Sequence, residues 1–153
     1  MKKSFCLLSL CFILFSCQIK TAQEAIIIDH YVSAEMEALG LPFSDAVRVG
    51  NMLYLSGQVG NLPGQMTLVE GGLKAEARQI MKNIQKVLEA NGSSLEHAVK
   101  FTIFIDDIAL WGEFNEVYVE FFPGKKPARS AFGADGLALG AAVEVECIAY
   151  IPN

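Results

Sequence analysis

Hydrophobic and polar positions along the chain predict two helices set among several strands. Between residues 72 and 91, apolar residues recur every three or four positions, which is the period of an amphipathic helix. A second helix of this kind is predicted over residues 108–122. Strands are predicted where β-branched and aromatic residues cluster or alternate, over residues 46–49, 51–59, 98–105, 128–132 and 141–151.

This order of elements predicts an α+β fold in which a mostly antiparallel sheet carries two helices on one face. The other face of such a sheet would expose a large apolar surface, so we expect the chain to associate with copies of itself. No internal repeat and no break in composition follows residue 25. Residues 25–153 are therefore predicted to form one domain.

The N-terminus has the pattern of an export signal. Two lysines precede an apolar run over residues 5–15, which is too short to span a membrane. The run ends in Leu14-Phe15-Ser16-Cys17, which resembles a bacterial lipobox. We predict a signal peptide over residues 1–16, lipidation of Cys17, a polar tether over residues 17–24, and a periplasmic or membrane-anchored protein. The alternative is that the run forms a buried strand or helix.

Composition and motifs exclude several classes of function. Of the 153 residues, 12 are Lys or Arg and 17 are Asp or Glu, so a net charge of −5 argues against a nucleic-acid partner. The only histidines, His30 and His97, have no ligand at metal-binding spacing. Ser56 lacks the first glycine of a nucleophile elbow, and no glycine-rich phosphate loop occurs. The sequence therefore gives no support to a metal site, a hydrolase triad or a nucleotide cofactor.

One arginine stands in an otherwise small and apolar strand. Arg129 lies within Pro127-Ala128-Arg129-Ser130-Ala131-Phe132-Gly133. A guanidinium in such a place can hold a substrate carboxylate through two parallel hydrogen bonds. The alternative is a structural ion pair.

Two glutamates share one face of the last predicted strand. Glu144 and Glu146 are two residues apart, so their side chains project to the same side, roughly 6.6 Å from each other. Half-burial beside a like charge should raise the pKa of one of them, as a general acid or base requires. The alternative is a strand kept soluble by its charges.

In combination, these segments resemble the Rid proteins, also called the YjgF family and named endoribonuclease L-PSP. The resemblance runs from about residue 41 to residue 152 and includes the strings LPFSDAV, LSGQ, PARSAFG and VEVECIAYI. It implies a chorismate-mutase-like fold, a homotrimer whose sheets form a central β-barrel, and ligand sites in the clefts between subunits.

The resemblance also implies roles for individual residues. Arg129 would hold the substrate carboxylate and Glu144 would position or activate water. The other residues implied to bind substrate are Phe43, Ser56, Gly57, Asn115, Tyr118 and Ala131. Many family members have a tyrosine where this chain has Phe43, and the best-known deaminase subgroup often has a cysteine at the position of Ala131.

The activity implied is hydrolysis of reactive 2-imino acids and their enamine tautomers to 2-oxo acids and ammonia, without a metal or organic cofactor. The alternative is a non-catalytic module that binds a 2-oxo acid or similar small carboxylate in the same cleft. A ribonuclease activity, which some relatives carry in their name, is disfavoured by the acidic composition.

Overall fold

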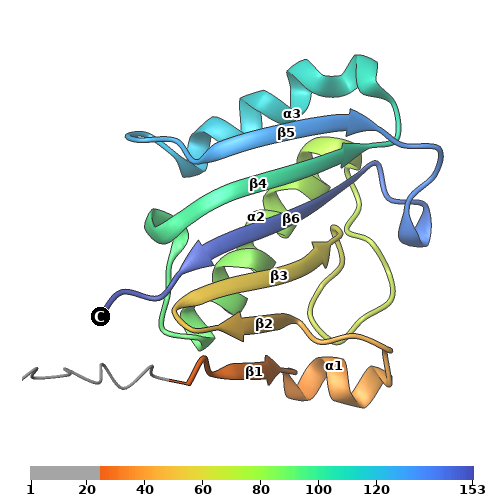
Figure 1. The fold of residues 1–153 in the computed structure, drawn as a ribbon. Helices are drawn as coiled ribbons and strands as arrows, with labels where there is room; N and C mark the ends of the chain where they lie inside the picture. Colours follow the sequence, from red (N-terminus) through yellow and green to blue (C-terminus); the bar gives the residue numbers. More distant parts are fainter. Residues whose placement is uncertain (1–24) are drawn as a thin grey trace, which may run out of the picture.

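A six-stranded sheet forms the centre of the protein, whose computed structural model describes residues 25–153. The strands are β1 (Ile28–Tyr31), β2 (Ala46–Val49), β3 (Met52–Gln58), β4 (Ala98–Ile105), β5 (Ala128–Gly133) and β6 (Val143–Tyr150). Their order across the sheet is β1-β2-β3-β6-β4-β5 (Figure 1). Only β4 and β5 pair in parallel, so the sheet is mostly antiparallel, as predicted.

Two helices, α2 (Gly72–Ala90) and α3 (Trp111–Tyr118), cover one face of the sheet (Figure 1). Short 3₁₀ turns, η2 (Ile108–Leu110) and η3 (Val119–Phe121), flank α3, so the second predicted helix is a short α-helix with a turn at each end. Two further 3₁₀ turns are η1 (Leu95–His97) and η4 (Ala138–Gly140). The predicted α+β class, with two helices on one face, is confirmed.

The hydrophobic core lies between α2, α3 and the sheet. Alternate residues of β6 turn toward the helices and are buried: Val143, Val145, Cys147 and Ala149. The apolar stripe of α2 meets them with Leu73, Ala77, Ile80, Met81, Ile84 and Leu88, all buried. The buried side chains, which recur every two residues in the strand and about every 3.6 residues in the helix, thus face the same core.

No helix of the described residues covers the opposite face of the sheet, which we call the open face. Register places large exposed apolar side chains there, including Ile28, Tyr54, Phe132 and Tyr150. An apolar surface of this kind marks a site of association. The single chain therefore has the uncovered face that the sequence predicts.

The first strand and the first helix are elements that the sequence pattern does not predict. β1 adds to the edge of β2, and α1 (Ala34–Leu39) follows directly. Ser33 caps the start of α1 by accepting a hydrogen bond from Met36 N, and Gly40 ends it with a left-handed φ of 63°. This pair of caps is the signal that could have predicted the helix.

Residues 1–24 lie outside the described part of the chain. The predicted signal peptide, the lipidation of Cys17 and the tether fall on these residues. Within residues 25–153, no helix combines the length and the apolar character needed to cross a membrane.

Candidate active site

Glu144 lies at the edge of a hollow of about 270 Å³. Its neighbours in β6, Val143 and Val145, are buried toward the helices, so the Glu144 side chain projects from the opposite face. Gly57 and Phe43 line the same hollow. Three of the residues implied by the sequence to form the site are therefore brought together by the fold.

The backbone of β3 gives the Glu144 carboxylate its place. The pairing of β3 with β6 shifts between Leu55 and Gln58, which is a bulge. At this bulge, a Cβ added to Gly57 would lie 2.9 Å from Glu144 Cδ and closer still to Oε1. Only a residue without a side chain allows the carboxylate to lie here.

Burial and a second carboxylate raise the proton affinity of Glu144. The pKa of Glu144 is raised above its ordinary value, first because the carboxyl is partly buried and second because Glu146 is close. The expectation drawn from the spacing of the two glutamates is confirmed. A carboxyl with a raised pKa binds a proton more tightly than an ordinary glutamate, which favours a role in accepting and returning a proton.

Ser56 holds the loop that carries Phe43. The Ser56 hydroxyl donates a hydrogen bond to the carbonyl oxygen of Ser44 at 2.7 Å, and the Ser56 N–H donates to the carbonyl oxygen of Asp45 at 3.0 Å. Phe43 is exposed and lies at the hollow. Ser56 is not among the residues that line the hollow, so its hydroxyl acts on the loop and not in the cavity.

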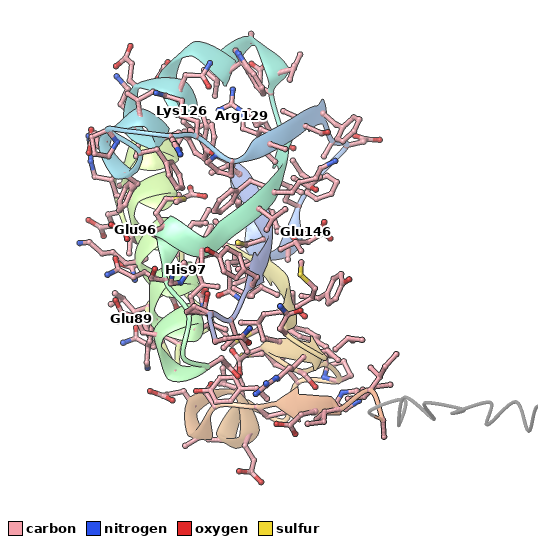
Figure 2. All side chains as sticks on the ribbon, turned by 60° about the vertical axis from the view of Figure 1, so that its left-hand side comes forward. Glu89, Glu96, His97, Lys126, Arg129 and Glu146 are labelled. Atoms are coloured by element: carbon pink, nitrogen blue, oxygen red, sulfur yellow. The ribbon has the colours of Figure 1, made fainter. Side chains whose placement is uncertain are left out.

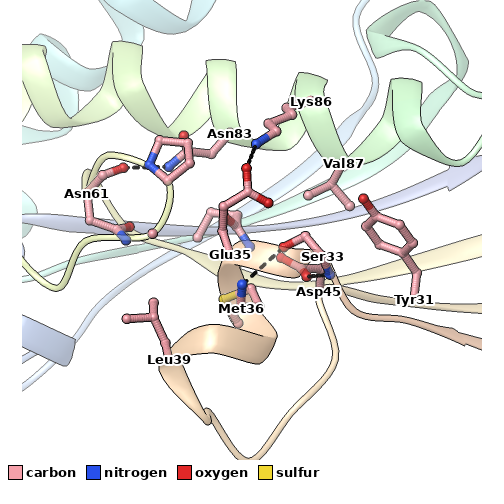
Figure 3. Close-up of a pocket in the computed structure, with 13 residues that line it drawn as sticks. Tyr31, Ser33, Glu35, Met36, Leu39, Asp45, Asn61, Asn83, Lys86 and Val87 are labelled. Carbon is pink, nitrogen blue, oxygen red and sulfur yellow. Dashed lines mark hydrogen bonds and ion pairs between the residues drawn. The ribbon is translucent and has the colours of Figure 1, made fainter.

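A smaller hollow of about 50 Å³ lies behind α1 (Figure 3). The contacts around it attach α1 to the rest of the chain. Lys86 of α2 forms an ion pair with Glu35 of α1 at 2.5 Å, and the Ser33 N–H donates to Asp45 Oδ2 at 2.7 Å. Met36 of α1 lines both hollows. The exposed Lys86–Glu35 ion pair adds little to stability. The hydrogen bond to the buried Asp45 therefore contributes more to holding the start of α1 in place.

Arg129 lies on β5 and points toward α3. Its guanidinium carbon is 4.5 Å from the centre of the Trp111 ring and 4.7 Å from the centre of the Tyr118 ring. In residues 25–153 the ion pairs are Lys74 with Glu116, Arg78 with Glu120 and Lys86 with Glu35, and none involves Arg129. The geometry therefore gives no support to the structural ion pair, and the guanidinium hydrogens remain available to an anion.

Other predicted residues gather around this arginine. Asn115 and Tyr118 follow Trp111 by four and seven positions and so share its side of α3, and Ala131 shares the face of Arg129 in β5. The Tyr118 hydroxyl is buried without a hydrogen-bond partner in the described residues. Burial raises the pKa of Tyr118 to about 12, although the nearby positive charge of Arg129 opposes this shift.

The predicted site thus falls into two clusters. We call Phe43, Ser56, Gly57 and Glu144 the carboxylate half-site, and Asn115, Tyr118, Arg129 and Ala131 the arginine half-site. Arg129 of β5 lies in register, across β4, with Cys147 of β6, so these two residues face the same side of the sheet. Glu144 is three residues from Cys147. Because side chains alternate along a strand, Arg129 and Glu144 project from opposite faces of the sheet. In Figure 2, Arg129 lies toward α3 while Glu146, on the face of Glu144, lies on the side away from α2.

The distance between the half-sites follows from the register. They are separated by roughly 10 Å along the strands and roughly 10 Å across two strand spacings. Within one chain, Arg129 and Glu144 therefore share no hollow. The expectation that a guanidinium and a carboxylate converge is not met by a single copy, because the pattern of one strand does not reveal which face another strand presents.

Several residues of the site were not expected from the sequence. Met36, Leu41, Met66 and Leu139 line the hollow beside Glu144. They come from segments outside the predicted elements, and no local pattern marks them. Trp111 of α3 also supports Arg129. No group of three or more His, Cys, Asp or Glu in residues 25–153 is arranged to hold a metal ion.

Comparison with known proteins gives the family. The sequence profile of the family described as endoribonuclease L-PSP matches residues 33–151. The chain belongs to this family. Members are also known as Rid or YjgF proteins, so the predicted resemblance is confirmed.

Curated relatives have related names. The chain is 44% identical over 112 residues to Protein HMF1 of Saccharomyces cerevisiae, which covers 73% of this chain and 86% of that protein. It is 42% identical over 108 residues to the 2-iminobutanoate/2-iminopropanoate deaminase of Mus musculus, which covers 71% and 80%. These relatives support the prediction that the chain is an enzyme of the deaminase type.

Solved structures of the L-PSP family share the fold. The RidA protein of an Antarctic Psychrobacter species superposes with a TM-score of 0.70 at 40% identity, covering 82% of this chain and 98% of that one. The YjgF gene product of E. coli gives a TM-score of 0.68 at 31% identity, covering 72% and 89%. The predicted fold of the family is therefore confirmed.

The prediction of an exported or lipid-anchored protein is wrong by the same comparison. One relative, 38% identical over 114 residues, is named as a chloroplastic protein, the Reactive Intermediate Deaminase A of Arabidopsis thaliana. The prediction depended on a short charged and apolar pattern. The run ends in Leu14-Phe15-Ser16-Cys17, where the bulky Phe15 departs from the small residues of a signal cleavage site.

Proposed function

We propose that this chain hydrolyses reactive 2-imino acids and their enamine tautomers to 2-oxo acids and ammonia. The observation that carries the proposal is the raised pKa of Glu144, whose carboxyl is held at a hollow by the bare backbone of Gly57. The names of the curated deaminases from mouse, rat and human add support. The domain responsible is residues 25–153.

The chemistry needs a positioned water and a proton carrier. The iminium carbon C2 is already electrophilic, so water attacks it while ionised Glu144 accepts a proton from that water. Glu144 then returns this proton to the nitrogen of the carbinolamine. As the C–N bond breaks, the carboxylate, ionised again, takes the proton of the new hydroxyl group, so the 2-oxo group forms and ammonia leaves. That proton then passes to ammonia, which leaves Glu144 ionised for the next turnover. An enamine such as 2-aminoacrylate first takes a proton at C3 to give the imine. Water supplies the oxygen, and nothing is oxidised or reduced.

Arg129 holds the substrate carboxylate in this proposal. The guanidinium is fixed on the rings of Trp111 and Tyr118, so it binds an anion with little further ordering. Because Arg129 and Glu144 lie on opposite faces of one sheet, the two act on one substrate only when they come from different copies. We therefore propose a homotrimer in which the open faces pack around the centre. The arginine half-site, which lies on the edge strand β5 of one copy, then joins the carboxylate half-site of the next.

A non-catalytic role remains the second candidate, and one residue favours it. Phe43 lines the hollow without a hydroxyl group that could bond to substrate or water. A module that binds pyruvate or a similar carboxylate needs Arg129 but not a proton carrier. The two candidates thus differ in what they require of Glu144.

The test measures ammonia release from freshly generated 2-iminopropanoate, with residues 25–153 as the protein and the uncatalysed rate as the baseline. A deaminase accelerates the release, loses turnover on Glu144→Gln while still binding pyruvate, and loses both on Arg129→Ala. A matched control is Lys82→Ala, which removes an exposed cation from α2, outside both half-sites. Binding of pyruvate with no acceleration of release would establish the binding module instead.

A further inference from the structure

The hollow beside Glu144 is lined mostly by hydrocarbon. Glu144 is the one ionisable residue among the described residues that line it. The amides are directed at backbone oxygens: Asn61 Nδ2 donates to the Gln65 carbonyl at 2.7 Å, and Gln58 Nε2 lies 3.5 Å from the Ser56 carbonyl. The large apolar residues of the lining are Met36, Leu41, Phe43, Val59, Met66 and Leu139.

This lining determines which side chain a substrate can place there. No cation faces the hollow from the lining residues, so a carboxylate-bearing side chain would find no counter-charge. The amide nitrogens of Gln58 and Asn61 already have acceptors, so a substrate group that only accepts hydrogen bonds finds no donor among them. A hydrocarbon or thioether side chain needs neither a counter-charge nor a hydrogen bond, and its transfer out of water is favourable.

The size of the hollow exceeds the needs of the smallest imino acids. The volume is about 270 Å³, while a water molecule in the liquid occupies about 30 Å³. A methyl side chain would occupy only part of this space. A branched side chain such as that of leucine would fill more of it and contact more of the apolar wall.

Leu139 is placed in this wall at a cost in backbone free energy. Its φ of 60° and ψ of 10° make it the one non-glycine residue of residues 25–153 with a positive φ. The left-handed region is unfavourable for leucine, and such conformations cluster at functional sites. The side chain nevertheless remains 43% exposed and lines the hollow. Core packing does not account for a leucine in this position.

Hydrogen bonds at both ends hold the loop that presents Leu139. The Gly136 N–H donates to Asp106 Oδ1 at 3.2 Å, and the Ala142 N–H donates to Glu76 Oε2 at 2.9 Å. Glu76 is itself buried in α2. Because Ala142 is two residues before Glu144, the same attachment fixes Leu139 and the proposed proton carrier relative to each other.

We infer that the hollow selects 2-imino acids with an apolar side chain of about four carbons over those with a methyl or charged side chain, and that Leu139 sets this preference. The inference rests on the proposed function and adds the class of substrate to it. The curated relatives from mouse, rat and human are named for 2-iminobutanoate, whose side chain is an ethyl group, and 2-iminopropanoate, whose side chain is a methyl group.

The experiment compares imines generated in place from L-alanine, L-leucine and L-glutamate by an amino-acid oxidase with catalase. Burial of one methylene is worth roughly fourfold in affinity. We expect kcat/KM for the leucine imine to exceed that for the alanine imine by about tenfold or more. Leu139→Asn should reduce this ratio to about threefold or less.

The variants are chosen so that loss of folding does not obscure the result. Asparagine and glycine accept a positive φ more readily than leucine, so Leu139→Asn and Leu139→Gly should have a Tm no lower than the parent. Leu62→Asn is the matched control, because Leu62 is 42% exposed and does not line the hollow. It should keep the parental ratio.

The outcomes separate this inference from the proposed function. Equal kcat/KM values for the leucine and alanine imines, or an unchanged ratio in both Leu139 variants, overturn the inference and leave the deaminase intact. If no imine is hydrolysed, the proposed function fails, and the affinities for 4-methyl-2-oxopentanoate and pyruvate test the hollow directly. A preference for the larger oxo acid that is lost in Leu139→Asn would still support the inference, and equal affinities would overturn it.

Discussion

The carboxylate of Glu144 occupies the space that a side chain on residue 57 would need. Gly57 lies at the bulge of β3, and a Cβ built there would overlap Oε1 of Glu144. The φ of Gly57 is not in the left-handed region, so the requirement for glycine comes from this close approach and not from backbone conformation. Backbone and carboxylate thus determine each other's position.

We expect Gly57→Ala to displace the Glu144 carboxylate. The added methyl group forces the side chain or the bulge to move, which should cost about 1–3 kcal/mol of stability and reduce kcat by about 10²-fold. Thermal unfolding and ammonia release measure the two effects. Gly112→Ala in α3, where an added Cβ meets no atom within 4 Å, is the control. It should leave kcat unchanged and should not lower stability, because alanine favours a helix more than glycine does. A fully active Gly57→Ala protein would show that the carboxylate need not lie here.

Glu144→Gln should remove activity and increase stability at neutral pH. Loss of a general acid or base reduces kcat by about 10²- to 10⁴-fold. The folded chain raises the pKa of Glu144, so as pH rises the unfolded chain ionises first and stability falls between the ordinary and the raised pKa. Glutamine cannot ionise, so the variant should have a higher Tm than the parent at pH 7.

The pH dependence separates this effect from general stabilisation. Below the ordinary pKa of glutamate, about 4.3, the carboxyl is protonated in both states and the Tm difference should disappear. Tm measured from pH 4 to pH 8 for parent and variant gives the comparison. For the parent enzyme, kcat should fall as the pH drops through the raised pKa, because the base becomes protonated. A Tm difference that is constant with pH would contradict the assignment.

Tyr118→Phe should stabilise the chain while weakening substrate binding. The buried hydroxyl has no partner in the described residues, so its removal should gain about 1 kcal/mol. If the hydroxyl serves the substrate carried by Arg129, KM should rise by about tenfold. Tyr31→Phe, at a partly buried tyrosine outside both half-sites, is the control. A more stable protein with unchanged KM would limit Tyr118 to packing.

The sequence predicts most of the fold because local periods match the core. The stripe of α2 from Leu73 to Leu88 and the alternation in β6 from Val143 to Ala149 both appear as buried faces in the structure. β1 and α1 could not be found in this way. They are short, α1 has no buried residue, and β1 is exposed along most of its length, so burial leaves no pattern in their sequences.

The candidate site could be predicted residue by residue but not in its geometry. Arg129 is conspicuous as a cation among small residues, and the spacing of Glu144 and Glu146 is enough to predict the direction of the pKa shift. Whether two side chains share a face depends on register across β4, which no local pattern specifies. The contribution of Leu139 was hidden for a similar reason, since its strained backbone belongs to a loop.

Mixed assemblies test whether Arg129 and Glu144 act together from different copies. Arg129→Ala and Glu144→Gln should each be inactive alone. When equal amounts of the two are refolded together, some interfaces combine the arginine of a Glu144→Gln copy with the glutamate of an Arg129→Ala copy. Random mixing makes about one interface in four intact, so we expect about a quarter of the parental rate. The measurement is ammonia release before and after mixing, with oligomer size followed by light scattering.

The control for this experiment mixes two differently tagged copies of Glu144→Gln, which share the same defect and should stay inactive. Recovery of activity in the first mixture alone requires that the two residues come from separate chains, since no single copy in it has both. This agrees with the opposite faces on which β5 and β6 present them. If hybrid oligomers form and the rate stays at the sum of the separate variants, the two half-sites do not join and the proposed site is wrong.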